Sequence, residues 1–181
     1  MRLVKCDEAG LKEVAAVLNG GGVAVIPTDT VYGLAAHPKF ASAVDRLYTI
    51  KARELAKPIA LLASDAAAAE AFVGGFPEGA ANLVSHWPGA LTIVVEGEGL
   101  RVPDHDWTRR LIAACGGVLR VTSANLSGRQ PATRADAALK DVGLSADIVA
   151  DDGISPGGVP STVVRVSPEG FEILRQGAVE I

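Results

Sequence analysis

Polar side chains follow directly after two apolar stretches of this sequence. Apolar residues 23–27 are followed by the run Thr28-Asp29-Thr30-Val31-Tyr32-Gly33-Leu34. A second apolar stretch, 118–122, leads into the run Thr122-Ser123-Ala124-Asn125-Leu126-Ser127-Gly128. Loops at strand ends commonly hold ligand groups in α/β proteins. Each run alone is equally consistent with an ordinary polar turn. Their repeated placement after strands predicts that they meet in one cleft.

Cations crowd a short connection further along the chain. Lys51, Arg53 and Lys57 lie close together, and only Glu54 offsets their charge. Lysine supplies a compact charge and arginine a planar fork that can hold two phosphate oxygens, so the cluster suits a polyphosphate. The alternative is that these cations complement a helix C-terminus, which stabilises by about 0.3 to 1 kcal/mol. Taken alone, the cluster favours this alternative.

Several familiar catalytic patterns are absent from the sequence. It contains no Gly-x-x-x-x-Gly-Lys-Ser/Thr phosphate loop and no Gly-x-Ser-x-Gly elbow. Its three histidines and two cysteines do not stand at metal-ligand spacing. We therefore predict neither a P-loop, a covalent nucleophile, a disulfide framework nor a metal site.

Composition and charge narrow the class of protein. The 181 residues are 49% hydrophobic and 21% charged, which predicts one globular domain over residues 1–181. The net charge of -4 argues against broad affinity for nucleic acids. A modest RNA-binding patch remains open, formed by Arg109, Arg110, Arg120, Arg129 and Arg134. With no long apolar run and an acidic pair in residues 1–10, we expect a cytoplasmic protein.

Helical and strand patterns alternate along the chain. Helices are expected after the cap Asp7, over 40–50, after the cap Ser64-Asp65, and over 77–86, 106–115 and 133–141. Strands are expected over 23–27, 58–63, 91–95, 100–103, 118–122 and 147–150, followed by a hairpin of 162–166 and 171–174. The order predicts an α/β fold with a mixed sheet. The loop 151–160 is expected near a site.

Six short motifs occur in an order that resembles one known family. They are Pro27-Thr28-Asp29-Thr30-Val31-Tyr32-Gly33-Leu34, Lys51-Ala52-Arg53, Trp87-Pro88-Gly89, Arg101-Val102-Pro103, Ser123-Ala124-Asn125 and Gly158-Val159-Pro160-Ser161-Thr162. A terminal Leu174-Arg175-Gln176-Gly177 follows them. The pattern covers nearly the whole chain and resembles the YrdC/TsaC family of threonylcarbamoyl-AMP synthases in its short, single-domain form.

The resemblance implies a fold and a reaction. The fold would be a twisted, mostly mixed sheet flanked by helices around an open basic cavity. The reaction would be that of an ATP-dependent nucleotidyltransferase, which joins L-threonine, bicarbonate or CO2 and ATP into threonylcarbamoyl-AMP and pyrophosphate for the t6A modification of tRNA. Mg2+ would accompany ATP without a dedicated protein site. Separate transfer proteins would pass the group to tRNA, and the chain itself would bind tRNA weakly.

The same resemblance assigns roles to individual residues. Lys51 and Arg53 would be catalytic. The ATP site would be built from Lys51, Arg53, Lys57, Ser123, Asn125 and Arg175. The threonine site would be built from Thr30, Arg101, the backbone at Val121, and Ser161.

Two departures and two alternatives accompany this interpretation. Leu62 stands where many family members carry a threonine-contacting histidine, and the segment between Val95 and Arg101 is short, so no ATP contact is assigned there. One alternative is a domain that adenylates carbamoyl phosphate, like that of the hydrogenase-maturation carbamoyltransferases. The other is a nonenzymatic RNA-binding module of the same fold.

Overall fold

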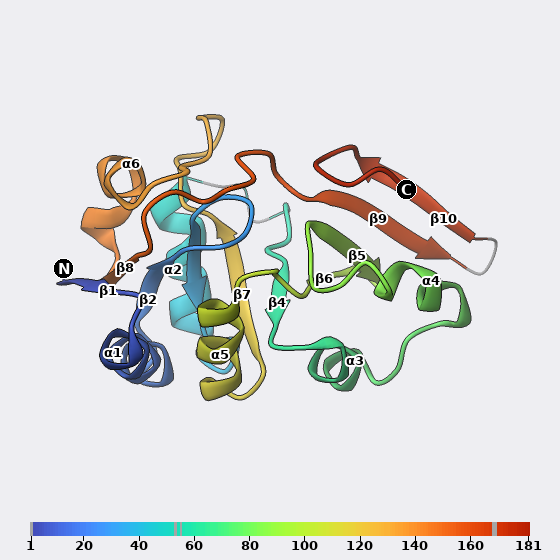
Figure 1. The fold of residues 1–181 in the computed structure, drawn as a ribbon, viewed down its shortest axis with the longest axis horizontal. Coiled ribbons are helices and arrows are strands. Elements are labelled where there is room, and N and C mark those ends of the chain that lie inside the picture. Colours follow the sequence, from blue (N-terminus) through green and yellow to red (C-terminus); the bar gives the residue numbers. More distant parts are fainter. Residues whose placement is uncertain (1, 53, 55, 168–169) are drawn as a thin grey trace.

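The ten strands formed by the described residues belong to one mixed sheet. The computed structural model describes residues 2–52, 54, 56–167 and 170–181. The strands are β1 (Arg2–Lys5), β2 (Val23–Ile26), β3 (Gly33–Ala36), β4 (Leu61–Ala63), β5 (Leu91–Val95), β6 (Glu98–Arg101), β7 (Val118–Ser123), β8 (Ile148–Asp151), β9 (Thr162–Ser167) and β10 (Gly170–Arg175). Their order across the sheet is β1-β8-β2-β3-β7-β4-β6-β5-β9-β10 (Figure 1).

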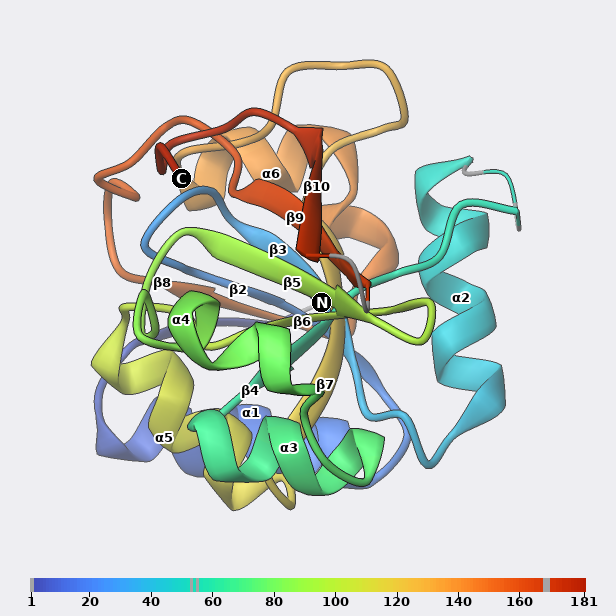
Figure 2. The ribbon, with the colours of Figure 1, turned by 90° about the vertical axis from the view of Figure 1, so that its right-hand side faces the viewer.

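Helices cover both faces of this sheet. They are α1 (Glu8–Asn19), α2 (Ala41–Lys51), α3 (Ala66–Val73), α4 (Ala81–Val84), α5 (Asp106–Ala114) and α6 (Ala135–Asp141), with 3-10 turns at Glu78–Ala80 and Gly143–Ser145. In Figure 2, α1, α3 and α5 lie together below the strands, while α6 lies above them and α2 to one side. No helix among the described residues has the length and apolar composition to cross a membrane.

Three apolar clusters hold these layers together. One joins α1 and α5 to the sheet through side chains such as Leu18 and Leu111. A second packs α2 and α6 on the other face, with Leu47 and Ala138 buried. The third lies under α3 and α4 around β5, β6 and β9. Apolar burial of this kind is the main favourable term in folding, so the clusters fix the frame that carries the polar loops.

Local sequence signals explain where several helices begin and end. The Asp7 carboxylate accepts the Gly10 backbone N–H at 2.8 Å and caps α1, and Asp65 caps α3 through Ala68 N at 2.8 Å. Helix α2 ends because Ala52 turns into the left-handed region at φ 49°. That turn leaves Lys51 as the last residue of the helix, beside the loop that follows β7.

The predicted α/β class and the C-terminal hairpin are confirmed, with some differences in detail. The sheet mixes parallel pairs such as β5 with β9 and antiparallel pairs such as β9 with β10. Two strands were missed, β1 and β3. The expected helix 77–86 is a 3-10 turn followed by the short α4, and the expected strand 58–63 is regular only from Leu61. One domain over residues 1–181 stays a prediction.

Strand β3 divides the first polar motif into a loop and a strand. Residues 28–32 form the loop, and Gly33 pairs with Ser123 in the antiparallel β3–β7 ladder. A Cβ on Gly33 would lie 2.5 Å from the Val121 side chain, so a larger residue would push the two strands apart. The ladder therefore places the two polar loops at the same end of neighbouring strands, as the sequence predicted.

Candidate active site

One large cavity opens where the polar loops meet. Its volume is about 770 Å³, and its wall is built by the loop after β2, the end of α2, residues 58–60, the β7 strand end with its loop, and the β9–β10 hairpin. Five of the described lining residues are cationic and none is acidic: Lys51, Arg101, Arg129, Arg165 and Arg175. The basic character of the cavity as a whole stays a prediction, since neighbouring carboxylates pair with several of these cations.

Eight of the ten residues predicted for the site line this one cavity. They are Thr30, Lys51, Arg101, Val121, Ser123, Asn125, Ser161 and Arg175. Lys57 is not among the described lining residues, and its ammonium lies 3.2 Å from the Glu54 carboxylate. Arg53, predicted as catalytic and ATP-binding, lies outside the described residues. The roles assigned to these side chains remain predictions.

Lys51 joins the end of α2 to the loop that follows β7. Its side chain is 2% exposed, and its Nζ donates to the Ser123 carbonyl, to Asn125 O at 2.6 Å and to Ser123 Oγ at 3.3 Å. An ammonium has three hydrogens, and these three acceptors are enough to use all of them. A phosphate oxygen would therefore have to replace one, and the long contact to Ser123 Oγ is the weakest.

Arg101, the last residue of β6, is held from several sides. It is 6% exposed. Its Nε donates to Gly89 O at 3.0 Å, one terminal nitrogen donates to Thr30 Oγ1 at 3.0 Å, and the other pairs with the Asp29 carboxylate. Burial lowers the pKa of Arg101, and the Asp29 charge raises it. Because a guanidinium has five N–H donors, two remain after these contacts with described residues.

The hydroxyl of Thr30 has a defined direction. Thr28 Oγ1 donates its one hydrogen to Val31 O at 2.7 Å, so it can only accept in its 3.0 Å contact with Thr30 Oγ1. Thr30 must donate in that contact, and its lone pairs then face Arg101 and the cavity. A ligand would meet Thr30 Oγ1 as a hydrogen-bond acceptor, which suits an amine better than a carboxylate.

Ser161 and Arg175 form another part of the cavity wall. The Arg175 guanidinium donates to Ser161 O at 2.7 and 3.2 Å and to Ser161 Oγ at 3.3 Å. The same hydroxyl lies 2.8 Å from Thr92 Oγ1. A Cβ on Gly177 would fall 2.4 Å from Pro160 O, so the terminal motif packs directly against the chain entering Ser161. The hairpin thus carries Arg175 to the cavity.

Asn125 presents an unused acceptor. Its amide nitrogen donates to Leu126 O at 2.9 Å and to Arg129 O at 2.8 Å, which fixes the orientation of the amide. Its Oδ1 is buried and has no hydrogen-bond partner among the described residues. Because a buried acceptor is costly when unpaired, this oxygen is suited to an O–H or N–H group of a ligand.

Sequence reasoning missed two of the lining cations. Arg129 pairs with Asp141 at 3.1 Å and Arg165 with Glu172 at 3.3 Å. Arg165 lies two residues after Val163 on β9, and residues two apart in a strand point to the same face, so this spacing could have placed both at the cavity. Arg129 carries no such signal, because its position depends on the irregular loop after Ser127.

The two noted departures also lie at the cavity. Leu62 pairs with Arg101 in the parallel β4–β6 ladder and is 5% exposed, so an apolar side chain lies beside that guanidinium. The short β5–β6 turn contributes Gly97 to the wall, and the following strand β6 contributes Gly99. Both features leave this part of the cavity without the polar side chains expected of the family.

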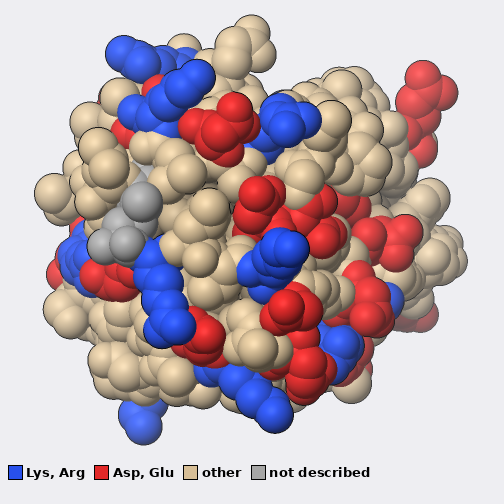
Figure 3. Space-filling view, turned by 60° about the vertical axis from the view of Figure 1, so that its left-hand side comes forward, with Lys and Arg blue, Asp and Glu red and all other residues tan. Residues whose placement is uncertain are grey.

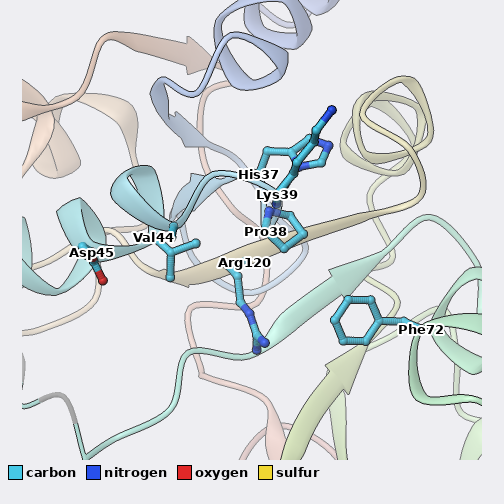
Figure 4. Close-up of a pocket in the computed structure, with 8 residues that line it drawn as sticks. His37, Pro38, Lys39, Val44, Asp45, Phe72 and Arg120 are labelled. Carbon is cyan, nitrogen blue, oxygen red and sulfur yellow. Dashed lines mark hydrogen bonds between the residues drawn. The ribbon is translucent and has the colours of Figure 1, made fainter.

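A second, separate hollow carries none of the predicted site residues. It has a volume of about 550 Å³ and lies between the start of α2 and Phe72 of α3 (Figure 4). The Arg120 guanidinium lies 6.0 Å from the Phe72 ring centre and is paired with Glu98 at 2.5 and 2.9 Å. We assign no function to this hollow.

The arginines considered for an RNA patch are paired with carboxylates. The pairs are Arg109 with Asp106, Arg110 with Glu8, Arg120 with Glu98, Arg129 with Asp141, and Arg134 with Asp136. Figure 3 shows acidic and basic side chains interspersed on one face of the molecule. Such pairing reduces the local positive potential, and weak tRNA binding remains a prediction.

Comparison with known proteins decides the family. The family model Sua5_yciO_yrdC, described as telomere recombination, matches residues 16–177. The chain belongs to this family. The threonylcarbamoyl-AMP synthase of Bacillus subtilis is 33% identical over 190 residues, covering 96% of this chain and 55% of that protein. A putative threonylcarbamoyl-AMP synthase of Mycobacterium leprae is 33% identical, covering 95% and 84%.

Solved structures of family members share the fold. A crystal structure of P. abyssi Sua5 complexed with L-threonine superposes with a TM-score of 0.89 at 28% identity, covering 97% of this chain and 56% of that one. This chain therefore spans little more than half the length of the Bacillus subtilis synthase and of P. abyssi Sua5. A HypF structure, at 18% identity and a TM-score of 0.75, is similar in fold alone.

Proposed function

We propose that the protein is an L-threonylcarbamoyladenylate synthase. The observation that carries the proposal is that three cations from distant parts of the chain, Lys51, Arg101 and Arg175, line one cavity with the hydroxyl and amide groups of both polar loops. Membership of the family, and relatives named as threonylcarbamoyl-AMP synthases, support it. The cavity volume of about 770 Å³ suits a nucleotide beside an amino acid.

The proposed reaction proceeds in two steps. The amine of threonine adds to CO2, supplied by bicarbonate, and loses a proton to give a carbamate. A carbamate oxygen then attacks the α-phosphorus of ATP, the bond to the β-phosphate oxygen breaks, and pyrophosphate leaves. Bringing two anions together requires fixed cations and donors more than a nucleophile. This requirement matches a cavity with cations at its wall.

The contacts suggest how threonine would be oriented. The two remaining N–H groups of Arg101 would bind the carboxylate, and Thr30 Oγ1 would accept from the amine. Ser161 and the backbone at Val121 would complete this half of the site. The amino acid would then lie on the β6 side of the cavity, with its amine directed toward the loop after β2.

ATP would occupy the side of the cavity near the β7 loop. Lys51, Arg175 and the predicted Arg53 and Lys57 would neutralise the triphosphate, with Lys51 exchanging its contact to Ser123 Oγ for a phosphate oxygen. Asn125 Oδ1 would accept from a nucleoside O–H or N–H group. The expected Mg2+ would be held by phosphate oxygens and water, as is common for ATP-using enzymes.

Substrate dependence tests the proposal. We expect pyrophosphate release from ATP only when threonine and bicarbonate are both present. Release with carbamoyl phosphate instead would favour the carbamoyl-adenylating alternative. Strong, salt-dependent retention of tRNA with no ATP cleavage would favour an RNA-binding module. The proposed product would be passed to tRNA by separate transfer proteins in the cytoplasm.

A further inference from the structure

We propose that Asp29 is a positioning residue that acts on the amino acid substrate through Arg101. The inference rests on the proposed function, because it concerns the side chain that would bind the threonine carboxylate. Asp29 is not among the described residues lining the cavity, whereas Thr28, Thr30 and Arg101 are. Its carboxylate would therefore influence the substrate without touching it.

Arg101 depends on Asp29 for both its charge and its orientation. The two side chains are 8% and 11% exposed, so water does little to screen or replace their contact. An unpaired guanidinium buried to this extent is strongly disfavoured. The other two anchors, Gly89 O and Thr30 Oγ1, are neutral. Asp29 is therefore the charged partner that keeps the guanidinium at the cavity wall.

Asp29 is itself held in place by the loop after β8. The Gly157 N–H donates to Asp29 O at 3.0 Å, and the Gly158 N–H donates to Thr30 O at 2.8 Å. A Cβ on Gly157 would lie 2.6 Å from Asp29 O and 3.1 Å from the Cα of Thr30, so only glycine allows this approach. The backbone of Asp29 and Thr30, two of the three Arg101 partners, is thus held in place by the loop after β8.

Two opposing effects of the Asp29 charge can be separated by substitution. Its negative charge competes with an incoming carboxylate for Arg101, while its oxygen orients the guanidinium. Asp29→Asn removes the charge but keeps an oxygen acceptor, and Asp29→Ala removes both. If the ion pair orients Arg101, the alanine variant loses more affinity for threonine than the asparagine variant does. If charge competition dominates, both variants bind threonine more tightly, which would overturn the proposal.

Steady-state kinetics with each substrate varied separately provide the test. We expect Asp29→Ala to raise the KM for threonine about tenfold, the equivalent of losing one oriented charge-assisted contact, with little change in the KM for ATP. Asp29→Asn, which keeps the oxygen acceptor but loses the charge, should raise the threonine KM less than Asp29→Ala does. Asp147→Ala is the matched control, since Asp147 also pairs with an arginine, Arg46, and accepts a backbone N–H. An unchanged threonine KM, or equal rises for both substrates, would overturn the proposal.

A second variant covers the case in which Asp29→Ala does not fold. Gly157→Ala should displace the backbone of Asp29 while leaving both Asp29 and Arg101 in the chain. We expect a selective rise in the threonine KM, whereas the control Gly79→Ala, whose Cβ meets only ordinary contacts at 3.5 Å or more, should leave it unchanged. Equal threonine KM values for the two glycine variants would contradict the role of Gly157 in holding the Asp29 backbone.

A readout independent of turnover separates this proposal from the proposed function. The Nε–H resonance of Arg101, assigned by its loss in Arg101→Lys, should shift and exchange faster in Asp29→Ala but not in Asp147→Ala. If the wild type makes no product from threonine, the proposed function fails, and this resonance alone decides the positioning role. An unchanged Arg101 resonance in Asp29→Ala would refute it in either case.

Discussion

Replacing Lys51 with methionine separates a structural role from a ligand-binding role. Methionine keeps most of the aliphatic volume of the buried side chain but removes its three donors. The Ser123 and Asn125 carbonyls would then lose their ammonium partner. The Ser123 carbonyl would still accept the Asn125 N–H at 2.9 Å, so Asn125 O is the one carbonyl left without a partner among the described residues. Leaving one buried acceptor unpaired costs about 1 to 3 kcal/mol if water does not replace the ammonium.

This loss is a measurable fraction of the stability of an ordinary domain, which is about 5 to 15 kcal/mol. A chain of 181 residues loses about 2 to 4 °C of melting temperature for each kcal/mol. The Lys51→Met variant should therefore melt roughly 2 to 12 °C below the wild type. The loop that carries Ser123 and Asn125 should also lose its fixed geometry, which would raise the KM for ATP in addition to removing a cation from the triphosphate.

Thermal unfolding with and without ATP is the appropriate assay. The wild type should gain melting temperature when ATP is added, because a ligand that binds only the folded state stabilises it. Lys51→Met should melt lower and gain little. An unchanged melting temperature without ATP would refute the view that Nζ satisfies the Asn125 carbonyl. A lower melting temperature with the full ATP shift would refute the proposed phosphate contact.

Three further predictions concern other parts of the chain. Arg101→Lys should raise the threonine KM roughly 10- to 150-fold in steady-state assays, because the loss of a charge-assisted contact costs about 1.5 to 3 kcal/mol. An equal rise in the KM for ATP would contradict this prediction. Ser161→Ala should raise the threonine KM only about 2- to 12-fold, since a neutral hydroxyl contact contributes about 0.5 to 1.5 kcal/mol and the carbonyl that binds Arg175 remains. Burial raises the pKa of the Cys115 thiol from 9.0 to about 11. Between these two pH values the folded chain keeps a proton that the unfolded chain loses. The free energy of unfolding should therefore fall as pH rises from about 9 to about 11. Cys115→Ala should reduce that slope in urea titrations, and an unaltered slope would contradict the assignment.

The elements that sequence patterns predicted best are those with strong local signals. Helix α1 has both a capping aspartate and a regular apolar face, and β5 is a continuous apolar run between turn residues. Strand β1 was missed because it is a short edge strand in which two apolar residues lie between two cations, without the alternation that marks a strand with one buried face. Strand β3 was missed because its small residues followed a polar motif that dominated the interpretation.

The composition of the site was more predictable than its contacts. Motif order identified eight of the residues that line the cavity, most of them at or near the end of a regular element. The ion pair between Asp29 and Arg101 could not be predicted, because it joins residues 72 positions apart and depends on the order of strands in the sheet. The same holds for Arg165, whose position depends on β9 pairing with β5.

We propose that this cavity joins a carbamate of threonine to the α-phosphate of ATP. Mass spectrometry of the product formed from threonine, ¹³C-labelled bicarbonate and ATP tests this proposal. We expect an AMP adduct that contains threonine and one labelled carbon, formed together with pyrophosphate. AMP without the labelled carbon, or an adduct formed only from carbamoyl phosphate, would contradict it.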